Sequence, residues 1–65
     1  MKALEQREDE VVVSLSNDDL DLIIAGLRET LQELEDWEFE TRTGFQRAEM
    51  RQFLDEMLTL ARRER

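Results

Sequence analysis

Apolar residues recur at spacings of three and four between residues 20 and 37, and this periodicity constrains the fold more than any other feature of the chain. Such spacing places the side chains on one face of an α-helix. Just before it, Ser16 and Asp19 occupy the N-cap and N3 positions of a capping box. We therefore predict a helix over residues 17–37, which leaves Leu22 off its buried face. That face consists of Leu20, Ile23, Ile24, Leu27, Thr30, Leu31, Leu34 and Trp37.

A second helix is predicted over residues 46–63. Gln46 and Glu49 repeat the N-cap and N3 pattern with a weaker cap, and Phe45 and Met50 have the spacing of a hydrophobic staple. The apolar stripe of this helix consists of Met50, Phe53, Leu54, Met57, Leu60 and Ala61, with Leu58 at its margin.

The segment between the two helices alternates apolar and polar residues at period two. A continuous helix through it would place Glu38 within the apolar stripe and Phe39 on the polar side. The first helix is therefore expected to end near Asp36 or Trp37. We interpret residues 38–45 as an extended connector, with a short strand as the alternative.

The N-terminal region divides into an arm and a strand. Residues 1–9 are charged and lack apolar periodicity, so we expect a flexible arm there. Val11, Val12 and Val13 are three consecutive β-branched residues, which favour an extended chain. We predict one strand over about residues 10–15, at the start of a single small domain spanning residues 10–65.

The hydrophobic core of this domain is expected to be thin. The chain has 65 residues and no cysteine or histidine, so neither disulfides nor a structural zinc site of the common kinds is available to reinforce it. Both apolar stripes are also broader than one facing helix can cover. The predicted fold is mainly α, a short N-terminal β-strand followed by an antiparallel two-helix hairpin. We expect it to dimerise into a four-helix bundle or to dock on a larger protein.

The composition argues against catalysis. Without histidine or cysteine the chain lacks an imidazole base and a thiolate nucleophile, and we predict no enzyme activity, cofactor or metal. Asp18-Asp19-Leu20-Asp21 lacks the register of a calcium-binding loop. Met1–Glu10 has no apolar core of a signal peptide and no apolar run reaches about 18 residues, so we expect a cytoplasmic protein that does not enter membranes.

The charge is concentrated in the first predicted helix. The net charge of -8 repels nucleic acid and anionic lipid and favours basic partners. Acids near the C-terminus of a helix oppose its dipole unless a cation compensates them. An antiparallel hairpin would bring Arg42, Arg47 and Arg51 close to this acidic end.

Aromatic residues lie within the same acidic run, so we predict that it contacts a partner protein. We favour a core position for Trp37 and leave Phe39 open between the core and the contact surface. The candidate site, called the acidic aromatic segment below, consists of Glu33, Glu35, Asp36, Trp37, Glu38, Phe39 and Glu40.

Two functions fit these observations. The first is a non-catalytic interaction module, an adaptor, inhibitor or immunity-type partner of a basic protein surface. The second follows from element order: a strand followed by two helices over residues 10–63 resembles the ribbon-helix-helix family. That resemblance implies a dimeric DNA-binding regulator or antitoxin whose strands pair across the dimer. Glu10, Val12 and Ser14 would then face the major groove.

Overall fold

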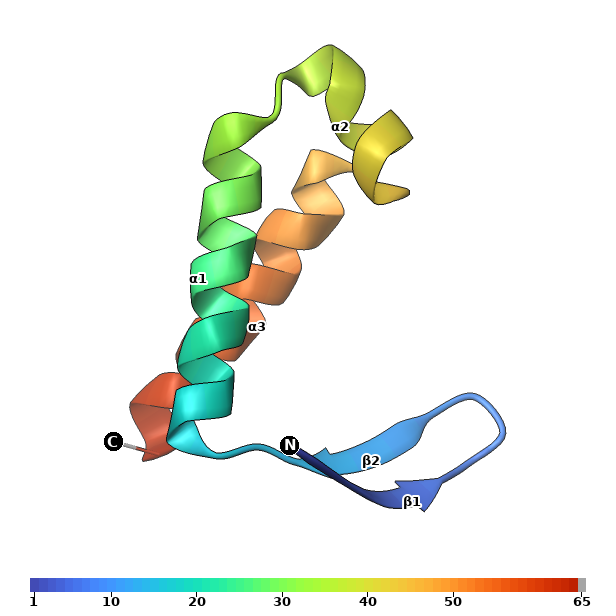
Figure 1. Cartoon of the computed structure of the whole chain (residues 1–65), viewed down its shortest axis with the longest axis vertical. Coiled ribbons are helices and arrows are strands. Elements are labelled where there is room, and N and C mark those ends of the chain that lie inside the picture. The colour runs from blue at the N-terminus through green and yellow to red at the C-terminus, as the bar shows by residue number, and fades with distance from the viewer. Residues whose placement is uncertain (65) are drawn as a thin grey trace.

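The computed structural model describes the backbone of residues 1–64 and the side chains of residues 1–62, and it is mainly helical (Figure 1). The elements follow in the order β1 (Lys2–Gln6), β2 (Val11–Ser14), α1 (Asn17–Glu33), α2 (Asp36–Thr43) and α3 (Arg47–Glu64). Helices α1 and α3 pack against each other in opposite directions, and α2 lies across the end where the chain turns back. The two strands form a hairpin that extends from the other end.

Helix α1 begins with the capping box that the sequence predicts. The backbone N–H of Asp19 donates to Ser16 Oγ at 3.0 Å, and the backbone N–H of Ser16 donates to Asp19 Oδ2 at 3.1 Å. Asp19 Oδ2 also lies 2.6 Å from the ammonium group of Met1. The bond to this ammonium group, followed by the bonds to Ser16, lowers the pKa of the Asp19 carboxyl below its ordinary value.

This carboxylate makes the stability of the fold depend on pH. Because its pKa is lower in the folded state, its contribution is fully present above the unfolded pKa of about 3.9 and is lost as the pH falls through the folded value. We expect urea denaturation to show a loss of stability below about pH 4 that is smaller in Asp19→Asn. Asp18→Asn removes a charge from the same turn without touching the capping box. If it flattens the acid profile as much as Asp19→Asn, the capping carboxylate is not responsible.

The core lies between α1 and α3 and is closed at one end by α2. Its buried residues are Leu20, Ile24, Leu31, Phe39, Leu54 and Ala61. Half-buried apolar side chains pack around them, namely Leu15, Leu27, Leu34, Met50, Met57 and Leu58. Ile23 is also half-buried, whereas Phe53 and Leu60, expected in the core or in a dimer interface, are 46% and 41% exposed.

The predicted boundary of the first helix is wrong. Helix α1 ends at Glu33, because Leu34 adopts an extended conformation with φ -91° and ψ 135°. The extended connector predicted over residues 38–45 is also wrong, since α2 occupies residues 36–43. Gly44 then ends α2 in the left-handed region at φ 79°, a conformation that favours glycine. The break at Leu34 changes the helical phase, so Phe39 faces the core.

The expectation of an unstructured arm at residues 1–9 is likewise incorrect. Strand β1 pairs antiparallel with β2, with Lys2 opposite Ser14 and Gln6 opposite Val11. A register irregularity lies between Ala3 and Glu5. The turn is closed by the N–H of Arg7, which donates to the carbonyl of Glu10 at 2.7 Å. Strand β2 thus finds its partner within the chain, unlike the strand of a ribbon-helix-helix protein, which pairs across a dimer.

Among the described helices, none combines the length and apolar character needed to cross a lipid bilayer.

Candidate protein-interaction site

The acidic aromatic segment spans the end of α1 and the first part of α2, and its two aromatic residues face opposite ways. Residues two apart on a helix point about 200° away from each other. Phe39 is accordingly buried, with 1% of its surface exposed, whereas Trp37 is 81% exposed. The prediction that Trp37 belongs to the core is therefore wrong. For Phe39, which the sequence left open, the structure gives a core position.

Arg47, at the start of α3, holds the segment in place. Its guanidinium donates to the backbone carbonyls of Leu31 and Leu34 and to Asp36 Oδ1, the last at 2.7 Å. It also lies over the ring of Phe39, 4.7 Å from the ring centroid. The Arg47 cation thus satisfies backbone carbonyls at the end of α1. Its charge offsets the unfavourable interaction between the acids there and the helix dipole. Its contact with Phe39 also fixes α2.

The other arginines expected near the acidic end behave differently. Arg42 pairs with Glu38 within α2 at 3.1 Å. Arg51 is exposed and forms no ion pair with the side chains of residues 1–62. Among the described side chains of the second long helix, only Arg47 therefore forms a salt bridge to the acidic aromatic segment.

The acids of the segment fall into two groups. Asp36 binds Arg47, and Glu38 accepts a hydrogen bond from the backbone N–H of Glu35 at 3.0 Å, so both support the local fold. The side chains of Glu33, Glu35 and Glu40 are exposed and form no ion pair within the described part of the chain. Asp36 is exposed as well, but it is paired with Arg47. The exposed residues of the predicted site that form no ion pair with a described side chain are Trp37, Glu33, Glu35 and Glu40, called the Trp37 face below.

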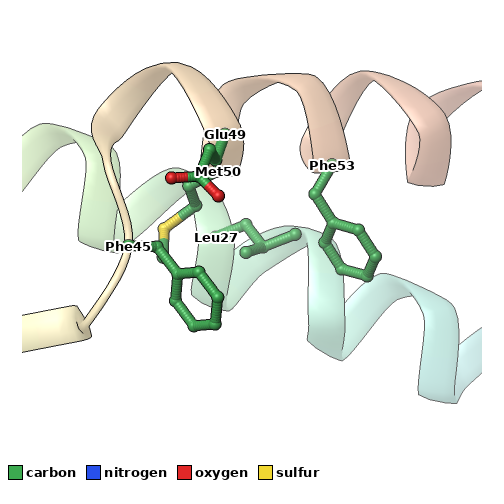
Figure 2. Close-up of a pocket in the computed structure, with 5 residues that line it drawn as sticks. All are labelled: Leu27, Phe45, Glu49, Met50 and Phe53. Atoms are coloured by element: carbon green, nitrogen blue, oxygen red, sulfur yellow. The ribbon is translucent and has the colours of Figure 1, made fainter. Parts of the chain in front are cut away.

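A second surface feature, which the sequence did not single out, is an apolar groove between α1 and α3. It has a volume of about 450 Å³ and is lined by Leu27, Phe45, Glu49, Met50 and Phe53. Figure 2 shows the rings of Phe45 and Phe53 on either side of Leu27, with Glu49 at the edge. The breadth of both apolar stripes predicted that part of the apolar surface would stay uncovered. It did not predict that Phe45 would line this surface, because the position of Phe45 depends on the short loop that follows Gly44.

Neither the described residues nor the comparisons add another kind of site. Within the described residues, no three acidic side chains converge in an arrangement that could hold a metal ion. A scan against protein-family models, a search of curated proteins and a search of solved structures each found no match to the chain.

Proposed function

We propose that this chain is a non-catalytic protein-interaction module whose Trp37 face docks on a basic surface of another protein, in the manner of an adaptor, inhibitor or immunity-type partner. The observation that carries the proposal is the 81% exposure of Trp37 on α2, a helix whose opposite face is packed against the core through Phe39. Tryptophan is enriched among residues that dominate binding energy at interfaces. Because Phe39 and Arg47 fix the backbone of α2, a partner that buries Trp37 has little backbone to order.

The charges around Trp37 favour a basic partner. Glu33, Glu35 and Glu40 are exposed, and the whole chain carries a net charge of -8. Exposed charges of one sign accelerate association with an oppositely charged surface, and added salt screens this effect. Trp37 would supply the apolar contact, while the acids would supply the steering.

The proposal is tested with a flexible peptide of lysine, glycine and leucine as a probe of a basic, partly apolar surface. Trp37 is the only tryptophan, so its emission reports burial at this position directly. We expect the peptide to shift this emission to shorter wavelength. Glu33→Lys/Glu40→Lys should slow association about tenfold at low salt, and Trp37→Ala should accelerate dissociation.

A matched control separates this face from the overall charge. Glu8 and Asp55 are exposed acids elsewhere, and Glu8→Lys/Asp55→Lys changes the net charge by the same amount. We expect this control to retain most of the wild-type association rate. Equal slowing by both double variants, or an unshifted emission when the peptide is bound, would contradict docking at the Trp37 face.

A homodimer built as a four-helix bundle is the second candidate arrangement. The exposure of Phe53 and Leu60, 46% and 41%, favours it, because two copies could cover these side chains. Sedimentation at micromolar concentration tests it, with a melting temperature that falls on dilution as the expected sign of a dimer. A monomer with concentration-independent melting would exclude it.

A further inference from the structure

The apolar groove between α1 and α3 is bordered by acids, and this border indicates what the groove binds. On α3, residues 49, 53, 56 and 60 follow one another at spacings of three and four and share one face. They alternate in character as Glu49, Phe53, Glu56 and Leu60, all exposed. Phe53 therefore lies between two carboxylates on this face of α3, and Leu60 follows beyond Glu56.

Helix α1 borders the groove in a similar way. Leu27 lies in the groove, and the exposed Gly26 and Glu33 lie about 100° and 120° around the helix from it, on one side. A Cβ added at Gly26 would meet no atom within 4 Å, so the surface of α1 is open at this position. A helix lying along the groove has room to approach α1 at this point.

Basic side chains lie on the other faces of both helices. Arg51 and Arg62 share the ridge of α3 with Asp55 and Leu58, about 160° around the helix from Glu49. Arg28 lies on the ridge of α1 that includes the buried Ile24. Along the described lengths of α1 and α3, the groove therefore combines an apolar floor with carboxylates and with no compensating cation.

We propose that the groove is a docking site for an amphipathic helix of a partner protein, with an apolar stripe flanked by lysine or arginine. Apolar residues at positions i, i+3, i+4 and i+7 of such a helix would fill the space between Phe45 and Phe53. Its basic residues would face Glu49 and Glu56 on one side and Glu33 on the other. A second copy of the chain fits less well, because two acidic borders would meet and each copy carries a net charge of -8.

The site is tested with a fluorescein-labelled helical peptide of leucine and lysine in this pattern, titrated with the full chain while anisotropy is measured. A scrambled peptide of the same composition and a peptide with glutamate in place of lysine are the controls. We expect micromolar binding of the patterned peptide, and binding at least about tenfold weaker for both controls. Equal binding of the scrambled peptide would overturn the proposal, since the attraction would then be one of charge alone.

Variants locate the binding to the groove. Phe53→Ala should weaken binding of the patterned peptide about tenfold. Phe45→Ala should also weaken it, and it tests a lining residue outside the helices that is 57% exposed. Glu49→Gln/Glu56→Gln should weaken binding several-fold and reduce its dependence on salt, while glutamine at position 49 retains the capping residue type of α3. Circular dichroism verifies that each variant is folded.

Two further results would count against the proposal. Glu8→Gln/Asp55→Gln removes the same charge away from the groove, and an equal loss of binding in this variant would overturn it. The same holds if the free chain sediments as a dimer that Phe53→Ala dissociates, because the groove would then be covered by a second copy. Binding that depends on Trp37 but not on Phe53 would support the Trp37 face while overturning the groove.

Discussion

Replacing Phe39 with alanine should lower the free energy of unfolding by about 3–5 kcal/mol, a large fraction of what a chain of this size possesses. Phe39 is 1% exposed, and its ring joins α2 to the core formed by α1 and α3. Its removal leaves a cavity and takes away the contact with Arg47. Urea denaturation followed by circular dichroism measures the loss. Phe39→Leu, which retains much of the apolar volume, should lose about 1.5 kcal/mol or less.

Trp37→Ala is the matched control, because it removes a larger aromatic side chain two positions away. With 81% of Trp37 exposed, its loss should change stability by less than about 0.5 kcal/mol. A comparable loss in both variants would show that Trp37 is packed against the fold, and it would contradict the orientation of α2.

Replacing Arg47 with alanine should cost about 2–3 kcal/mol, since charge-assisted hydrogen bonds are lost while their backbone partners stay partly buried. The guanidinium is shared between the carbonyls of Leu31 and Leu34 and the carboxylate of Asp36. Arg47→Lys retains the charge without the planar fork, so it should recover only part of the loss. Thermal denaturation at two salt concentrations measures both variants.

Arg42→Ala provides the comparison for Arg47. Its salt bridge to Glu38 is an i,i+4 pair on an exposed arginine, and such pairs contribute about 0.3–0.5 kcal/mol. If Arg42→Ala and Arg47→Ala destabilised the fold equally, Arg47 would be only one surface charge among several. If Arg47→Lys matched the wild type, the bonds to the carbonyls would contribute little.

The two long helices were predictable because local and tertiary signals agree in them. The capping box of Ser16 and Asp19 begins α1 as expected, and the spacing of three and four identifies the side of α1 that carries the buried Leu20, Ile24 and Leu31. The interaction of Arg47 with the acidic end was predictable in outline, since an antiparallel hairpin brings it there. Its bonds to backbone carbonyls were not, because they depend on where α1 ends.

Helix α2 and strand β1 could not be predicted from pattern alone. The stretch from Trp37 to Thr43 alternates at period two, yet it forms a helix because Phe39 gains burial and Gly44 provides the left-handed end. A glutamate three residues after Glu35 was the available signal of a helix start. Strand β1 contains no β-branched residue, and its extended form follows from pairing with β2, a contact that local propensity does not report.

Under the proposed function, the opposite placement of Phe39 and Trp37 makes α2 a thermodynamic link between folding and partner binding. A helix of eight residues is marginal by itself, so α2 depends on Phe39 and Arg47 to stay formed. A ligand that binds Trp37 only when α2 is helical would stabilise that helix in proportion to its affinity. Conversely, a substitution that loosens Phe39 inside the core would weaken binding on the outer surface without removing any atom that the ligand touches.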